Sequence, residues 1–262
     1  MGDTRWPYKD GELFFYHMSE WVIVFVLTLA TGLAMVVGAL IALVEHISNR
    51  WLESEFRHGV VAFGGGILIS AVALVLIPEG TKNQTPLFVV LWFGLGGVCF
   101  MGIDILLNRI HEMATQLTAM LIDFIPEVIA LGALYLLDKH YAVLLAFLII
   151  FQNIPEGFNA YLELRTDSRH KGKTIIYTFF AMSFLGPILG LSGYFFLSEF
   201  PVVISGIMLF ASGGILYMIF QDIAPLAKIK KRWMPALGAI LGFIFGMVGK
   251  MLIMHTKTEL SL

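Results

Sequence analysis

Eight long apolar runs constrain the fold of this chain more than any other feature of its sequence. Each has roughly 20 residues or more, the length that an α-helix needs to cross a bilayer. With 58% hydrophobic and 14% charged residues, the 262-residue chain is too apolar for an ordinary soluble domain. We therefore predict an all-α polytopic membrane protein, an eight-transmembrane-helix bundle. The predicted helices cover residues 20–46, 57–79, 86–107, 113–137, 141–164, 173–198, 201–226 and 233–254.

Short polar breaks separate these runs, which predicts one transmembrane domain over residues 1–262 and no soluble module. Lys and Arg accumulate in cytoplasmic loops of membrane proteins. The first, third, fifth and seventh breaks hold 11 of the 17 basic residues, and the opposite side holds 6. We therefore expect both termini outside, in a plasma or inner membrane. The N-terminal sequence has no feature of a removable signal peptide.

Charge and cysteine content exclude several other classes of protein. A formal net charge of −2 gives no indication of a nucleic-acid partner. The single cysteine, Cys99, excludes an intrachain disulfide and a CxxC metal or redox site. The chain has no GxxxxGK[ST] motif, so we do not expect direct use of ATP.

Two similar segments in the fourth and fifth runs place carboxylates deep in the predicted membrane. They are Asp-Phe-Ile-Pro-Glu at 123–127 and Gln-Asn-Ile-Pro-Glu at 152–156. A carboxylate at this depth costs free energy and is by default a candidate for substrate handling. A purely structural alternative, with the carboxylates bonded to neighbouring hydroxyl groups, is less expected for the same reason.

Spacing predicts that the two segments face each other. Only residues 138–140 join the runs, so the helices are expected to be antiparallel neighbours. Counted from Lys139, Glu127 is 12 residues away and Gln152 is 13, which puts both segments roughly 18–25 Å from the turn. Asp123 and Glu156 lie one turn further along their helices, on the same faces. Four oxygen-bearing side chains can therefore converge in two layers, where a divalent cation would compensate three negative charges.

The prolines of both segments strengthen the expectation of a binding site. Pro126 and Pro155 each remove a helical hydrogen bond, which leaves the carbonyl groups of Ile122 and Phe151 without their usual donor. Discontinuous helices of this kind surround substrate sites in transporters. We therefore predict two bent helices around one captured ion.

Three other acidic residues in or near the apolar runs each have two possible interpretations. Asp104 and Asp222 either line a pathway or reach water from near the interface. Glu79, after Pro78, either marks an entrance or, more expected, is a solvated residue at a helix end. Lys250 is expected to extend its side chain toward the interface.

Residues 152–157, Gln-Asn-Ile-Pro-Glu-Gly, resemble the fifth-helix motif of the ZIP (Zrt/Irt-like) family of divalent metal transporters. The similarity extends to the second helix, with Gly-Gly-Gly-Ile-Leu at 64–68 and Ile-Pro-Glu-Gly at 77–80, and to the seventh helix at 213–225. The resemblance implies eight helices with both termini outside, in agreement with the loop charges. It implies a divalent metal ion as the substrate (Zn, Fe, Mn or Cd), no organic cofactor and a lipid bilayer as surroundings. A homodimer is one candidate assembly.

By the same resemblance, the principal transport site corresponds to four residues and one outer contributor. The four are Asp123, Glu127, Gln152 and Glu156, and Asn153 is at most the outer contributor. Asp123 stands where the family has histidine, which leaves oxygen ligands alone. Such a set suits manganese, iron(II) or magnesium better than a histidine-bearing site does, although zinc and cadmium also accept oxygen.

Two further departures concern a second, auxiliary metal that some members of the family bind. Phe124 stands where the family has asparagine, and Gly186 stands where it has glutamate. Neither side chain can bind a metal, so we expect one metal site and no binuclear centre. The histidine-rich loop between the third and fourth helices is also reduced, to residues 108–112.

We therefore predict an importer that carries divalent metal into the cytoplasm, and no enzyme. Involvement of protons is left open, because neighbouring carboxylates titrate together. One alternative is a ZIP-like membrane protein that binds metal without transporting it. The other is an intramembrane hydrolase, which is less expected because His111-Glu112 is followed by Thr115 and not by the second histidine of HExxH.

Overall fold

The chain folds as a bundle of helices that are long enough to cross a membrane. The computed structural model describes residues 19–44, 50–107, 114–166, 171–197, 199–227 and 233–259. These residues form helices and turns without a strand, and they include eight helical spans of sufficient length and apolar character. The predicted all-α, eight-helix architecture is confirmed, and the chain is an integral membrane protein.

Three of the eight spans contain a short π-helical segment, marked η. In chain order, the spans are α2 (Glu20–Val44); α3, η1 and α4 (Arg50–Ala71, Val72–Leu76, Ile77–Thr81); α5 (Pro86–Leu107); α6 (Ala114–Leu137); α7 (Lys139–Thr166); α8, α9 and η2 (Gly172–Ser183, Leu185–Ser192, Gly193–Leu197); α10, η3 and α11 (Pro201–Met218, Ile219–Ile223, Ala224–Ala227); and α12 (Met234–Glu259). We call the end where α2 begins and α12 ends the terminal end. The opposite end is called the basic end, because its connections carry most of the basic residues.

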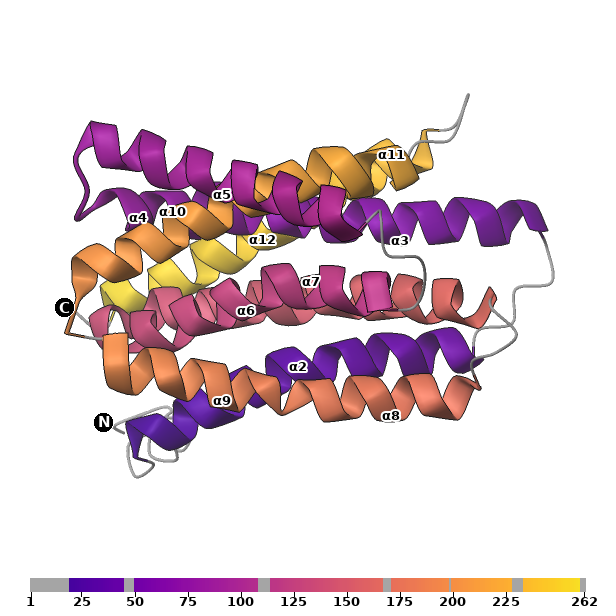
Figure 1. The fold of residues 1–262 in the computed structure, drawn as a ribbon, viewed down its shortest axis with the longest axis horizontal. Coiled ribbons are helices and arrows are strands. Elements are labelled where there is room, and N and C mark those ends of the chain that lie inside the picture. The colour runs from indigo at the N-terminus through magenta and orange to yellow at the C-terminus, as the bar shows by residue number, and fades with distance from the viewer. Residues whose placement is uncertain are drawn as a thin grey trace, which may run out of the picture.

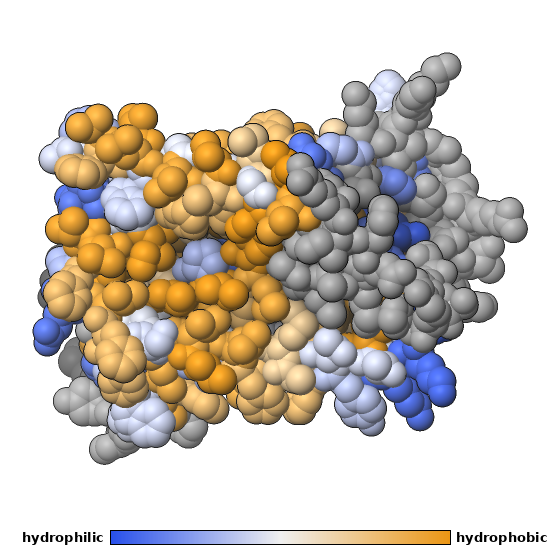
Figure 2. Space-filling view, viewed as in Figure 1, coloured by the Kyte–Doolittle hydropathy of each residue, from blue (hydrophilic) through white to orange (hydrophobic). Residues whose placement is uncertain are grey.

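Helices α6 and α7 lie in the middle of the bundle (Figure 1). On its two sides α7 packs against α2 and α3, while α6 packs against α9 and α10. The outer helices α5 and α12 pack on α10 and α3 and expose many large apolar side chains. Figure 2 shows hydrophobic residues over much of the side of the bundle, as expected for a surface that faces lipid.

The connection between α6 and α7 is a single residue, Asp138. Its Oδ1 atom accepts hydrogen bonds from the backbone N–H groups of His140 (3.1 Å) and Tyr141 (3.3 Å). This side chain therefore caps the first turn of α7. The short turn holds the two central helices antiparallel, as the sequence predicts.

The predicted interruption of the helices at Pro126 and Pro155 is not found, while the predicted bends stay a prediction. Both α6 and α7 continue as α-helices through their prolines. A proline removes one backbone donor, and the remaining bonds together with packing against neighbouring helices preserve the helix. Irregular backbone is found instead in η1, η2 and η3, in the second, sixth and seventh spans.

Lys250 of α12 has partners on two other helices. Pro78 has no N–H to donate to the carbonyl group of Leu74, four residues earlier. Lys250 Nζ donates to that carbonyl oxygen at 3.0 Å and lies 5.9 Å from the ring centroid of Tyr141 in α7. The lysine therefore joins three spans, where the sequence predicted only an approach to the interface.

The three glycines at 64–66 let α3 contact three different helices closely. A Cβ atom on the first would lie 3.0 Å from the ring of Pro155 in α7, and one on the second would lie 2.8 Å from Ile223 in η3. A Cβ atom on the third would overlap the carbonyl oxygen of Ala239 in α12. Small residues allow helix backbones in lipid to approach closely in this way.

Candidate metal site

The predicted site residues lie near the middle of the two central helices. Asp123 and Glu127 are one turn apart on α6, and Gln152 and Glu156 are one turn apart on α7. Asp123, Glu127 and Gln152 are each at most 2% exposed, and Glu156 is partly buried. The chain therefore buries a carboxylate-rich group at the depth where its cost is greatest.

A pair of hydrogen bonds joins Glu127 to Gln152. Gln152 Nε2 donates to both carboxylate oxygens of Glu127, at 3.0 Å to Oε1 and 2.8 Å to Oε2. The two side chains come from different helices, so they lie at the same depth and face each other. Counting residues from the turn predicted this pairing correctly.

The other two carboxylates lie near this pair without a positive partner. Asp123 Oδ1 accepts a hydrogen bond from the N–H of Phe124 at 2.9 Å. The negative charges of Asp123 and Glu127 both act on Glu156. Within the described ranges, none of the three carboxylates forms an ion pair with Lys, Arg or His. Their mutual repulsion therefore needs compensation by a cation or by protons.

The side chains do not form a closed cage in this conformation. In the part of the chain that the structure describes, no three His, Cys, Asp or Glu side chains are grouped so that they could hold a metal ion. Instead, the Gln152 amide nitrogen donates hydrogen bonds to both carboxylate oxygens of Glu127. The predicted convergence is thus seen directly for Glu127 and Gln152, and the role of the four residues as ligands stays a prediction.

One buried oxygen of this group has no partner. Gln152 Oε1 is enclosed and accepts no hydrogen bond from the described residues. A buried polar atom left unpaired costs about 1–3 kcal/mol. Carboxylate and amide oxygens are ligands for hard divalent cations, so Gln152 Oε1 beside Glu127 fits such an ion chemically.

Asn153 is directed away from this pair. Its Nδ2 atom donates to the carbonyl oxygen of Thr31 in α2 at 2.9 Å. Successive residues of an α-helix point about 100° apart, so Gln152 and Asn153 necessarily serve different neighbours. The described contact of Asn153 positions α7 against α2, and its part as an outer metal ligand stays a prediction.

Phe124 and Gly186, which stand where some ZIP proteins have ligands for a second metal, lie side by side. Phe124 is buried, and its Cζ atom is 3.5 Å from the position of a Cβ atom on Gly186. The backbone of Gly186 also packs against the carbonyl oxygen of Thr28 in α2. An aromatic ring thus fills the space beside Gly186, and neither residue supplies a ligand atom from its side chain there.

A second acidic group lies toward the basic end. Asp104 of α5 accepts a hydrogen bond from Tyr217 Oη of α10 at 2.9 Å. The charges of Asp104 and of Glu163 in α7 act on Asp222 in η3. Sequence reasoning named Asp104 and Asp222 but missed Glu163 and Tyr217. The spacing of Glu163, two helical turns after Glu156 on the same face of α7, could have indicated it.

Glu79 corrects another expectation. It is only 7% exposed and forms an ion pair with Lys82, so it is not a solvated end residue. The following residue, Gly80, packs on Leu209 of α10, which explains the burial of α4.

The reduced loop at residues 108–112 lies outside the described residues.

Comparison with protein-family models gives no match, and comparison with curated proteins gives none either. The similarity to the ZIP family therefore rests on the motifs in the sequence.

Proposed function

We propose that this chain is a divalent metal transporter of the ZIP type, which imports metal through the group formed by Asp123, Glu127, Gln152 and Glu156. One observation carries the proposal. A Glu127–Gln152 pair is buried at mid-membrane beside two more carboxylates, with no basic partner among the described residues. Intramembrane carboxylates of this kind mark ion pathways in membrane proteins.

In this proposal the metal takes the place of the Gln152 amide nitrogen. A half-turn of the amide would direct Oε1, which now has no partner, toward an ion held by the carboxylate of Glu127. Glu156 and Asp123 lie one turn away on each helix and would supply the remaining negative charge. Oxygen ligands without cysteine permit the reversible binding that transport requires.

The ion would leave toward the basic end as groups of helices move against one another, as in other transporters. Asp104, Asp222 and Glu163 lie on that side and make the route favourable for a cation. On this basis the basic end faces the cytoplasm, which agrees with the distribution of Lys and Arg.

The test is metal uptake by the purified protein in proteoliposomes. Uptake of Mn²⁺, Fe²⁺, Zn²⁺ or Cd²⁺ above that of protein-free vesicles is the expected result. Tight binding without uptake would instead support the non-transporting alternative. Cleavage of a peptide substrate, abolished by Glu127→Gln, would support the hydrolase.

Asp123→His is expected to move the metal preference toward zinc. The substitution places a nitrogen ligand in a group that otherwise offers oxygen atoms, and imidazole suits zinc better than it suits manganese. The measurement is competition between Zn²⁺ and Mn²⁺ for uptake, with Asp104→His as a control outside the four-residue group. An unchanged ranking of metals would show that Asp123 is not a ligand.

Titration of the purified protein is expected to give one strong metal site per chain. The ring of Phe124 occupies the space beside Gly186, so no second ligand set forms there. Isothermal calorimetry with Mn²⁺ or Cd²⁺ measures the stoichiometry. Two strong sites per chain would contradict the expectation.

A further inference from the structure

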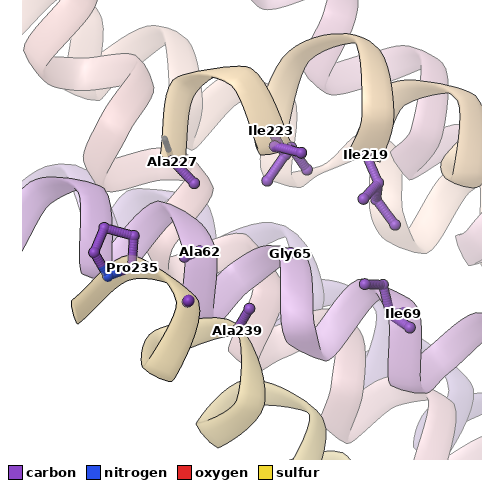
Figure 3. Close-up of a pocket in the computed structure, with 10 residues that line it drawn as sticks. Ala62, Gly65, Ile69, Ile219, Ile223, Ala227, Pro235 and Ala239 are labelled. Carbon is purple, nitrogen blue, oxygen red and sulfur yellow. The ribbon is translucent and has the colours of Figure 1, made fainter. Parts of the chain in front are cut away.

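A cavity of about 310 Å³ lies between three spans in the basic half of the bundle. Ala62, Gly65 and Ile69 of α3 form one side, and Ile219 and Ile223 of η3 face them (Figure 3). Residues of α11 and α12 complete the lining, and none of the lining residues belongs to the candidate metal site. All the lining residues are aliphatic or glycine, so the cavity suits an apolar ligand of a size at the lower end of ligand pockets.

The cavity runs along the bundle from its basic end toward its middle. Its inner end lies at Ile69 and Ile219, and its outer end lies where α11 ends and α12 begins, at Ala227 and Pro235. From Ala62 to Ile69, α3 rises by about 10 Å. Such a position and direction match those of a lipid acyl chain.

The exposed side chain of Trp233 indicates the depth in the membrane at which the outer end of the cavity lies. Trp233 directly precedes α12 and is 70% exposed. Exposed tryptophan side chains gather at the headgroup level of membranes. The mouth of the cavity at Pro235, two residues later, therefore lies close to lipid headgroups.

Charge selects the kind of lipid. By sequence, the five residues that join α11 to Trp233 are Lys-Ile-Lys-Lys-Arg, residues 228–232. Clusters of basic residues directly beside a span attract anionic lipids. In the sequence these four positive charges directly follow α11 and directly precede Trp233 and α12. An anionic headgroup is thus favoured over a zwitterionic one.

We propose that this cavity binds one acyl chain of an anionic phospholipid. The bound chain fills the space between α3, η3 and α12, and its headgroup stays at the basic end. Binding uses none of the residues assigned to metal, so it stands whether or not the chain transports metal.

The test compares lipid retention by native mass spectrometry. Phosphatidylglycerol and phosphatidylcholine with identical chains are added to the purified protein, and the lipid that remains bound is counted. The variant is Ala224→Leu/Ala236→Leu, at two exposed lining positions where larger side chains fill the cavity without burying new groups in the core. The matched control is Ala181→Leu, an exposed alanine of α8 outside the cavity.

The wild-type protein and the control are expected to retain one phosphatidylglycerol per chain. The filled variant should retain it at least about tenfold less, because exclusion of two methylene groups from apolar burial already corresponds to that factor. Equal retention by the filled variant would overturn the proposal, as would equal retention of phosphatidylcholine. A dimer that disappears in the filled variant would assign the cavity to a second copy of the chain and would also overturn it.

A second measurement does not depend on the variants. Crystals grown with phosphatidylglycerol brominated on its acyl chain are examined by anomalous scattering. A bromine peak inside the cavity, next to its lining residues Ile69, Ile219 and Ala236, is expected. Bromine found only on the outer surface of α5 or α12 would contradict binding in the cavity.

Discussion

Glu127→Gln is expected to abolish metal uptake and leave the protein folded. The change removes one negative charge and keeps the shape of the side chain, and the new amide oxygen can still accept from Gln152 Nε2. If Glu127 binds the ion directly, uptake should fall by about 100-fold or more, beyond the 10–100-fold typical of groups that only support a ligand. Thermal stability without metal should stay equal or rise, because one of three mutually repelling buried carboxylates is gone.

The control for this variant is Glu20→Gln. Glu20 begins α2 at the terminal end and pairs with Lys139, with 2.6 Å between Oε1 and Nζ. It undergoes the same chemical change at a position outside the proposed site. Uptake should persist in Glu20→Gln within about twofold, since exposed ion pairs contribute little. Uptake by Glu127→Gln at the wild-type rate would remove Glu127 from the site, and loss of both uptake and folded yield would show a structural role.

The sequence predicted the spans and the depth of the acidic group well, for physical reasons. Bilayer thickness sets the length of a span, so apolar runs mark the helices almost by themselves. The single-residue turn at Asp138 allowed depth to be counted along both central helices, and the Glu127–Gln152 bonds agree with that count. Both predictions depend only on local geometry.

Helix rotation and packing could not be predicted in the same way. Gln152 and Asn153 are both polar, and only the positions of α6 and α2 show that the first bonds to Glu127 and the second to Thr31. Irregular backbone was expected at the prolines of the fourth and fifth spans, whereas the π-helical segments lie in the second, sixth and seventh spans. Glu79 was misjudged for a related reason, since its burial depends on contacts of α4 with α10, distant in sequence.

Gly157→Leu is expected to cause the largest loss of folded protein of any substitution considered. Gly157 of α7 faces the backbone of Met35 in α2, where an added Cβ atom would overlap the carbonyl oxygen and lie 2.8 Å from Cα. Gly38 of α2 in turn packs against the carbonyl oxygen of Ile154 in α7. Helices in lipid associate largely through such close backbone packing. The penalty should therefore lie at or above the upper end of the range of about 1–3 kcal/mol for overpacking.

Gly94→Leu is the matched control, because a Cβ atom on Gly94 in the middle of α5 would meet nothing within 4 Å. Fluorescence-detected size-exclusion chromatography gives the folded yield, and a melting curve gives the stability. Gly94→Leu should behave as the wild type, while Gly157→Leu should lose most of its monodisperse peak. Equal yields would mean that α2 and α7 can separate without penalty. Their backbone contact would then no longer explain how Gln152 is held level with Glu127, since Asn153 and Gly157 fix the same face of α7 against α2.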